Sequence, residues 1–160
     1  MKYTLCFILT TVFVMLGCTR PTHFYPVQGP LSSQIPLPVL NGKFSAGVSS
    51  GNISVVMQDG ETCKGRWTIV RPSQSAKGSA STSVQTGMPA SWDAVYGSGY
   101  YVAHVLGARL YAQSVIPCAQ GDSVTVEIYE PDGGGIGGTP QTIRGVAKDS
   151  KENIYKLAVD

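Results

Sequence analysis

The strongest constraint in this sequence is a two-residue alternation of apolar and polar side chains in short segments from Lys43 onward. Successive side chains of a β-strand point to opposite faces of the sheet, so a segment of this kind buries one face. Every second position is apolar in 53–57, Asp59-Gly60 follows, and 61–71 form a matching segment. Asp-Gly suits a type I′ turn, whose two central residues both need a positive φ. This part of the chain is therefore predicted to be a β-hairpin.

The same pattern recurs in later segments, which glycine or polar turns separate: 100–106, 109–116, 124–129, 142–147 and 154–159. No segment shows a convincing helical period. Seven or eight short strands at this spacing are typical of an antiparallel β-sandwich or a small barrel. The predicted fold class is therefore all-β.

Composition excludes two classes of protein. The 160 residues suit one domain with accessory segments. The net charge is only +2, from 12 basic and 10 acidic side chains, whereas a dedicated nucleic-acid binder shows a concentrated basic excess. With 42% hydrophobic residues, the chain is also too apolar for a charged disordered protein.

Two stretches interrupt the strands. The first, near 72–90, is rich in Ser, Thr, Gly and Ala and is predicted to be a flexible insertion. The second, 131–140, contains the spacing G-x-G-x-x-G. A dinucleotide site needs a helix to begin at the last glycine, whereas a proline and a strand pattern follow here. Neither a nucleotide nor another cofactor is predicted.

The first residues have the pattern of an export signal. Met1-Lys2 is followed by an uncharged run of fourteen residues, 3–16. A membrane-spanning helix needs about 20 apolar residues, so the run better matches the hydrophobic region of a signal peptide. An uncleaved anchor helix is the alternative, which the length of the run and the nearby Arg20-Pro21 disfavour.

The run ends in Met15-Leu16-Gly17-Cys18, which resembles the lipobox of bacterial lipoprotein precursors. The resemblance implies that the signal peptide 1–17 is removed, and that Cys18 carries a diacylglyceryl group and an acylated amino terminus. Several buried acyl chains make such an anchor effectively permanent. Met15 stands where the family usually has Leu. Ordinary signal-peptide cleavage is the alternative, although no Ala-x-Ala-like site follows the run.

The lipobox also implies a location. Thr19, and not Asp, follows the cysteine, which resembles lipoproteins sorted to the outer membrane of Gram-negative cells. The expected location is the cell envelope, at the outer membrane if the cell is Gram-negative. The expected first partner is the membrane, through the lipid.

Residues 18–42 are predicted to be a tether, followed by a β-domain at 43–160. The segment contains half of the chain's ten prolines: Pro21, Pro26, Pro30, Pro36 and Pro38. Proline fixes φ and lacks an N–H, which favours an extended chain over a helix. Apolar residues such as Phe24 and Leu40 argue against full solvation, and the later half is expected to pack along the domain edge.

The four cysteines divide by location. Cys6 leaves with the signal peptide and Cys18 takes the lipid, which leaves Cys63 and Cys118. An even pair in an exported domain predicts a disulfide, here across a span of 55 residues. Two unpaired buried thiols are the alternative. A catalytic thiol is not predicted, because neither cysteine has a histidine or basic residue in a recognisable relation to it.

Motifs for catalysis or metal binding are weak. The two histidines, His23 and His104, lack a third ligand at matching spacing, so no metal site is predicted. No G-x-S-x-G nucleophile motif is present. Carboxylates such as Asp122 and Glu127 fall in predicted turns and strand ends, where solvated charge is the norm. No catalytic residue is assigned.

A cluster of aromatic residues gives the one positive indication of binding: Trp92, Tyr96, Tyr100 and Tyr101, beside Gly97 and Gly99. Aromatic rings next to flexible glycines can form a ligand platform for sugars or peptides. They are also common core residues. Both interpretations stay open at this point.

The β-domain is similar to small uncharacterised envelope lipoproteins, in 59–67, 145–149 and 154–157. That similarity implies no known activity. We expect a lipid-anchored, non-enzymatic protein that binds or supports another envelope component, a protein or a glycan. The alternatives are an envelope enzyme, such as a glycan hydrolase using carboxylates that the fold brings together, and a structural surface antigen.

Overall fold

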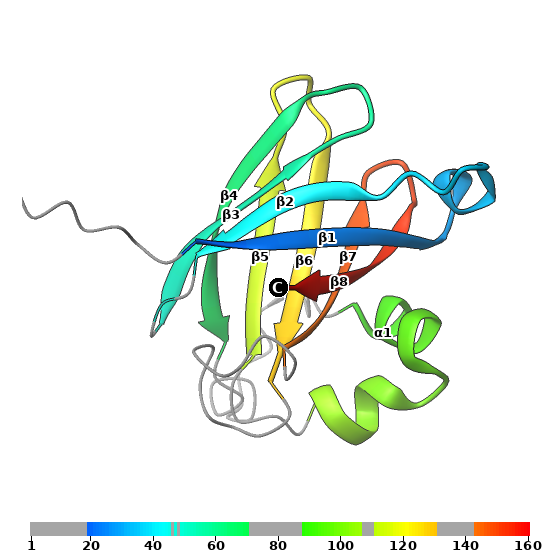
Figure 1. The fold of residues 1–160 in the computed structure, drawn as a ribbon. Helices are drawn as coiled ribbons and strands as arrows, with labels where there is room; N and C mark the ends of the chain where they lie inside the picture. The colour runs from blue at the N-terminus through cyan, green and yellow to red at the C-terminus, as the bar shows by residue number, and fades with distance from the viewer. Residues whose placement is uncertain (1–18, 46, 48, 71–87, 107–110, 131–142) are drawn as a thin grey trace, which may run out of the picture.

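The computed structural model describes residues 19–45, 47, 49–70, 88–106, 111–130 and 143–160. The described strands form one closed antiparallel barrel (Figure 1). They are β1 (Thr19–Gln28), β2 (Leu40–Ser45), β3 (Ser50–Val56), β4 (Thr62–Val70), β5 (Tyr111–Pro117), β6 (Ser123–Tyr129), β7 (Arg144–Asp149) and β8 (Ile154–Val159). Each strand pairs with the next, and β8 pairs with β1. The prediction of an all-β small barrel with seven or eight strands is confirmed.

Several predicted features lie outside the described residues. They are the signal peptide 1–17, the lipidation site Cys18, most of the insertion near 72–90, and the glycine loop 131–140.

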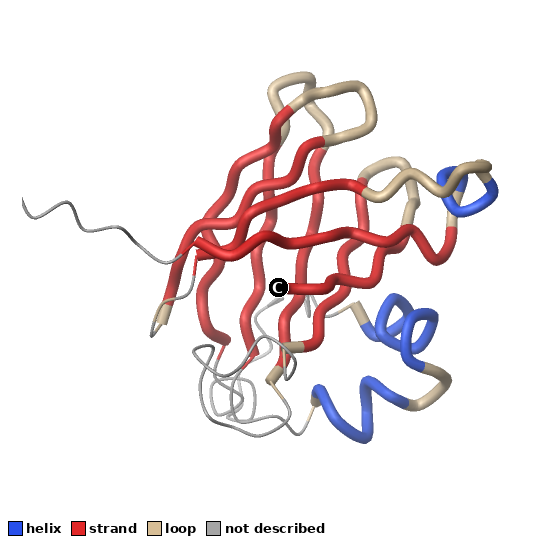
Figure 2. The backbone as a smooth tube through the Cα atoms, viewed as in Figure 1, coloured by secondary structure: helices blue, strands red, loops and turns tan. Residues whose placement is uncertain are grey.

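In the described part of the chain, three short helical segments accompany the strands (Figure 2): η1 (Pro30–Ser33), α1 (Pro89–Tyr96) and η3 (Tyr101–Val105). α1 and η3 lie between β4 and β5 in sequence, and α1 packs outside the barrel against β7, β8 and β1. No helix in the described part of the chain is long and apolar enough to cross a membrane.

The strand predicted at 100–106 is wrong, because this segment is helical. Pro89 begins α1, where its missing N–H costs nothing. Gly97 and Gly99 then take positive φ values of 107° and 80° and break the helix before η3. The rings of Trp92, Tyr96 and Tyr100 recur every four residues, a spacing that places them on one side of a helical chain.

The tether predicted at 18–42 is also wrong where the structure describes it. Thr19–Gln28 is a full barrel strand, paired with β2 on one side and β8 on the other. Its alternation is clear in the structure, because Thr22, Phe24 and Pro26 are buried while their neighbours are more exposed. The barrel therefore includes the described residues from Thr19 onward and does not begin at Lys43.

Two prolines are tolerated in β1 because of their positions. The Pro21 carbonyl accepts a hydrogen bond from the Asp160 N–H at 3.1 Å, just past the end of β8. Pro21 therefore lies at the end of the β1–β8 pairing. Pro26 lies beyond the β2 pairing, which stops at Phe24, and next to a bulge in the β8 pairing. Proline is found in sheets at such ends and bulges.

The interior of the barrel is filled by large apolar side chains. Phe44 stacks on Trp67 with ring centroids 5.4 Å apart, and Phe24 meets Tyr155 edge-on at 6.2 Å. All four are fully buried. The core is therefore packed by side chains, as expected for a barrel of eight strands.

The seam between β4 and β5 has a mixed construction. Three backbone pairs, ending at Thr68 and Gln113, join the strands at the end of the barrel where β1 begins. Toward the other end, the disulfide Cys63–Cys118 joins them, which confirms that prediction. Between these, Gly65 lies against Ile116, where an added Cβ would be 3.1 Å from the Ile116 Cα. The disulfide thus closes the barrel where the backbone ladder has stopped.

Candidate functional sites

The structure brings the predicted aromatic residues together outside the barrel. Trp92 is fully buried, and its ring centroid lies 5.5 Å from that of Tyr96 and 6.0 Å from that of Tyr100. Tyr96 and Tyr100 stack on each other at 4.8 Å, and His104 lies 4.6 Å beyond Tyr100. Tyr101 also packs against this cluster. Trp92 is therefore a core residue of the helical cover, while the three tyrosines are only partly buried.

Glu127 fixes this cluster to the barrel. It lies on the outer face of β6, is fully buried, and accepts hydrogen bonds from the Trp92 indole N–H at 2.8 Å and the Met88 backbone N–H at 2.9 Å. Gln113 donates a longer bond of 3.4 Å from β5. The prediction that Glu127 is a solvated carboxylate is wrong. Its neighbours in sequence gave no sign of this, because its two shorter hydrogen bonds come from a segment 35 to 39 residues away, and the longer one comes from Gln113 on the adjacent strand.

Asp93 holds the corner between α1 and η3. Its carboxylate accepts hydrogen bonds from the backbone N–H groups of Gly99 at 3.0 Å and Tyr101 at 3.1 Å. The bond from Tyr101, followed by that from Gly99, lowers the pKa of Asp93. This cap places Tyr100 and His104 in line with the rings of α1.

Two cations complete the surface. The Arg144 guanidinium of β7 lies 5.6 Å from the Tyr96 ring centroid and 5.9 Å from that of Tyr100. The Lys156 ammonium of β8 lies 5.8 Å from the Tyr96 centroid. All three distances suit cation–π attraction. Burial raises the pKa of Tyr96, whose hydroxyl donates a weak bond of 3.4 Å to the Gly145 carbonyl.

Two exposed apolar side chains belong to the same helical cover. Val102 and Leu106, four residues apart in and just after η3, are 68% and 57% exposed. We name the surface formed by Tyr96, Tyr100, Arg144 and Lys156 the aromatic face. Sequence analysis missed both cations, because β7 and β8 lie about 50 residues from α1 in the chain. The four-residue spacing of the rings was the signal that could have identified the helical stack.

A second candidate site lies at the end of the barrel opposite the start of β1. We name this end, where the β3–β4, β5–β6 and β7–β8 turns lie, the turn end, and the site there is a surface depression. Its volume is about 360 Å³. Leu31 and Met57 supply apolar lining, and polar groups come from Gln58, Asp59 and the β7–β8 turn. Its polar lining is held by a buried hydrogen-bond network.

Asp149 is the centre of that network. Its carboxylate accepts bonds from the backbone N–H groups of Lys151 and Asn153, each at 2.9 Å. It also accepts from the Asn153 amide at 2.9 Å and the Tyr155 hydroxyl at 2.6 Å. Asn153 in turn accepts the Leu31 backbone N–H at 2.8 Å. An ionised carboxylate offers about four lone-pair sites, so these donors saturate Asp149.

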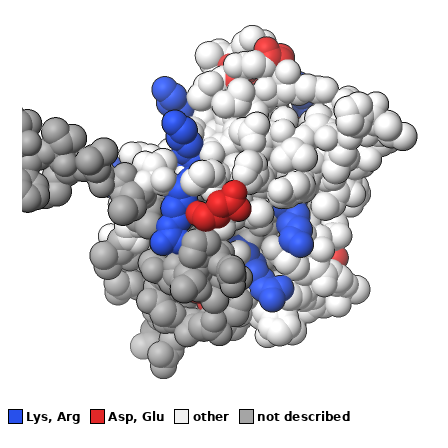
Figure 3. Space-filling model, in the orientation of Figure 1, with Lys and Arg blue, Asp and Glu red and all other residues white. Residues whose placement is uncertain are grey.

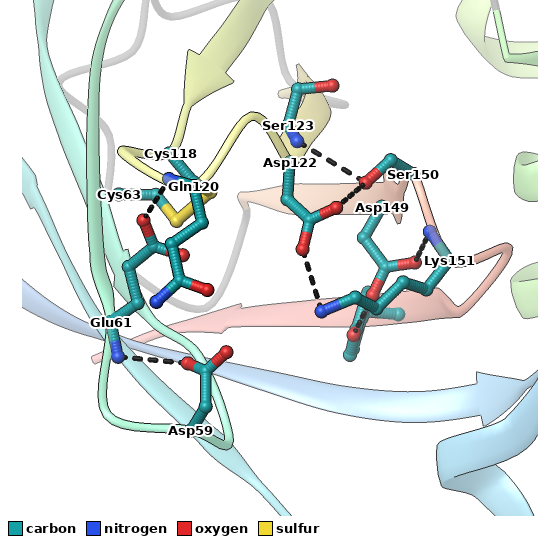
Figure 4. Close-up of a disulfide and its surroundings, with 11 residues drawn as sticks. Asp59, Glu61, Cys63, Cys118, Gln120, Asp122, Ser123, Asp149, Ser150 and Lys151 are labelled. Carbon is teal, nitrogen blue, oxygen red and sulfur yellow. Dashed lines mark hydrogen bonds and ion pairs between the residues drawn. A yellow bond between two sulfur atoms is a disulfide. The ribbon is translucent and has the colours of Figure 1, made fainter.

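The turns at this end are joined by charged side chains (Figure 4). Lys151 reaches Asp122 at 2.7 Å, and the Ser150 hydroxyl donates to Asp122 at 2.9 Å. The hydrogen bond from Lys151 lowers the pKa of Asp122, and the same bond raises the pKa of Lys151. Asp122 was predicted to be a solvated turn residue. In the structure it instead pairs with two side chains of the neighbouring β7–β8 turn.

Glu61 lies beside the disulfide, with one carboxylate oxygen near both sulfur atoms. The sulfur atoms are bonded to each other and are therefore not the thiolates that a metal site uses. Glu61 accepts the Gln120 backbone N–H at 2.9 Å instead, which ties the β5–β6 turn to the β3–β4 turn.

No protein-family model, curated protein or solved structure shows a significant match to this chain. Its function is therefore inferred from the geometry of these two surfaces and from the sequence.

Proposed function

We propose that this protein is a lipid-anchored, non-enzymatic binding protein of the bacterial cell envelope. The lipobox-like sequence that ends at Cys18 supports the anchor, and the Cys63–Cys118 disulfide suits an oxidising compartment. Metabolic labelling with palmitate tests the anchor. Labelling should be lost in Cys18→Ala, and unchanged labelling of that variant would overturn it.

The observation that carries the binding role is the aromatic face. Partly exposed tyrosines and an arginine are the residue types enriched at the energetic centres of protein interfaces. Val102 and Leu106 add exposed apolar area in and just after η3, in the same helical cover, and Arg144 and Lys156 favour a partner that carries carboxylates. The proposed partner is another envelope component, a protein or a glycan, that covers this face.

Three of the described carboxylates support a non-enzymatic role through the bonds that they already make. Glu127 holds the helical cover, Asp149 is saturated by four donors, and Asp93 caps η3. Each is committed to a structural contact, whereas a glycan hydrolase needs a pair of carboxylates that face the same bond of a substrate.

A photo-crosslinking amino acid at Val102, in intact cells, tests the binding role. A matched control places the same amino acid at Val115, which is 58% exposed on the outer face of β5. We expect discrete adducts from position 102 and none from position 115. Digestion of the adducts with a protease or with a glycan hydrolase then distinguishes a protein from a glycan. Equal adducts at both positions, or none at 102, would contradict the proposal.

A further inference from the structure

The start of β1 leaves no spacer between the barrel and a lipid on Cys18. Thr19 is the first residue of β1 and pairs with Ser45 of β2. Consecutive Cα atoms are about 3.8 Å apart, so residue 18 lies within one peptide unit of the barrel. If the proposed lipidation of Cys18 holds, this end of the barrel is at the membrane surface.

The wall nearest to that point is formed by β2, β3 and β4. Thr19 pairs with Ser45, the Ser45 hydroxyl bonds to the Asn52 backbone at 2.6 Å, and Asn52 pairs with Arg66. Neighbouring strands lie about 4.8 Å apart, so the Arg66 backbone is roughly 14 Å from Thr19. One continuous row of residues therefore connects the anchor position to Arg66.

The outer face of these three strands is basic. Lys43 and Lys64 both pair with Ser54, on opposite sides of it, and Arg66 is the next outward residue along β4. All three cations are exposed, and within the described ranges none forms an ion pair with a carboxylate. Arg66 donates one hydrogen bond to the Ser50 hydroxyl at 3.0 Å. We name this surface the basic wall.

Figure 3 shows basic side chains along the side of the molecule that β3 and β4 occupy, and acidic side chains at the top, near the β3–β4 turn. The same view also shows an acidic group in the middle of this face, beside the basic side chains, and further basic side chains on its other side. The turn end carries five acidic residues and two lysines: Asp59, Glu61, Asp122, Asp149, Glu152, Lys148 and Lys151. An anionic surface would attract the basic wall and repel the turn end. The charge asymmetry and the anchor position thus favour the same orientation, in which the basic wall and not the turn end faces an anionic surface.

We propose that the barrel lies with its basic wall against anionic phospholipid headgroups. The proposal rests on the lipid anchor proposed above. Basic residues are attracted to an anionic bilayer within about a Debye length, roughly 10 Å at 0.1 M salt, and a basic patch commonly supplements a lipid chain. β7 is four strands from β3 in the closed barrel, so the aromatic face points away from this membrane contact.

Site-specific quenching on vesicles tests the orientation. The lipidated protein is reconstituted in vesicles of zwitterionic and anionic phospholipid that contain a quenching headgroup label. A fluorophore is attached under non-reducing conditions to Asn52→Cys, on the basic wall, or to Gln120→Cys, at the turn end. Both native side chains are exposed. We expect quenching at position 52 to exceed that at position 120 several-fold.

Charge removal provides the control. The variant Lys43→Gln/Lys64→Gln/Arg66→Gln, and salt near 1 M, where the Debye length is about 3 Å, should both bring the two positions toward equal quenching. Mass spectrometry of the same sample reports the lipid on Cys18. Equal quenching with the lipid present would overturn the orientation alone, whereas a bare Cys18 would overturn the anchor and the orientation with it.

Discussion

The basic wall and the wall that α1 and η3 cover are built from similar antiparallel strands, yet their outer faces differ. On the basic wall most outward residues are polar or charged, such as Lys43, Ser54 and Arg66, with Val56 as an apolar exception, and they remain in contact with solvent. On the outer face of β6 and β7, the corresponding positions include Tyr129 and Val146, which are buried beneath the helical cover.

This difference shows how outward residues decide what covers a sheet. An antiparallel sheet is stable with one face in water when its outward residues are polar. Apolar outward residues require a cover, and here the chain supplies one from the segment between β4 and β5. Glu127 specifies where that cover docks, because a buried carboxylate must be given hydrogen-bond donors. The basic wall recruits no segment of the described chain and is left available to an external surface.

The largest expected effect is at the seam between the two walls. Removing the disulfide with Cys63→Ser/Cys118→Ser should lower the free energy of unfolding by about 4 kcal/mol, because a constraint over 55 residues is lost from the unfolded chain. Chemical denaturation measures this change. Reduced wild-type protein should match the double variant. A loss below about 1 kcal/mol would mean that the backbone ladder alone closes the seam.

The covered wall predicts a second effect, confined to one region. Trp92→Ala removes a fully buried ring and leaves Glu127 without one donor, so we expect a loss of about 3 kcal/mol. Hydrogen exchange should show lost protection in α1 and retained protection in β2–β4. Val102→Ala, at an exposed position of the same cover, should change stability by less than about 0.5 kcal/mol. Equal loss of protection in both walls would show that the cover and the barrel unfold as one unit.

A smaller loss of stability is expected when the Glu127 carboxylate itself is changed. Glu127→Gln keeps the shape of the side chain but replaces one acceptor oxygen by a donor, which faces either the Trp92 or the Met88 N–H. We expect a loss of about 2 kcal/mol in thermal or chemical unfolding. Glu61→Gln is the matched control, since Glu61 is only half-buried and accepts one backbone bond. A similar effect in both variants would contradict a special role for Glu127.

The smallest effect concerns the pH dependence of the cover. The backbone donors of Tyr101 and Gly99 lower the pKa of Asp93 in the folded state. The contribution of Asp93 is therefore complete above the unfolded pKa, near 3.9, and is lost as the pH falls through the lower folded pKa. Hydrogen exchange in η3 between wild type and Asp93→Asn should differ at pH 6 and converge at low pH. A constant difference across that range would exclude this titration.

Local sequence signals explain most of the barrel. The alternation in 53–57 and 124–129 predicted β3 and β6, and Asp59-Gly60 predicted the turn between β3 and β4. The prediction of a tether was wrong because prolines were taken as evidence against a strand. Proline is compatible with a strand where backbone pairing is absent on one side, and Pro21 and Pro26 both lie at such positions. The prediction of a strand at 100–106 was wrong because a short apolar run fits both the two-residue period of a strand and the period of a helix.

The candidate site was predictable only in part. Trp92, Tyr96, Tyr100 and Tyr101 were identified together because they are close in sequence, and the structure confirms that they cluster. Which ring is core and which is at the surface depends on Glu127, which lies beyond the reach of a local pattern. The lipid on Cys18 and the partner of the aromatic face remain predictions.

The sequence by itself determined the all-β class, the hairpin at Asp59-Gly60 and the pairing of Cys63 with Cys118. Side-chain alternation, turn conformation and cysteine count are properties of neighbouring residues or of composition. The tertiary structure alone decided that β1 closes the barrel, that the cover docks on Glu127, and that three cations from β2 and β4 form one wall. These features depend on strand order and register, which bring together residues that are far apart in the chain.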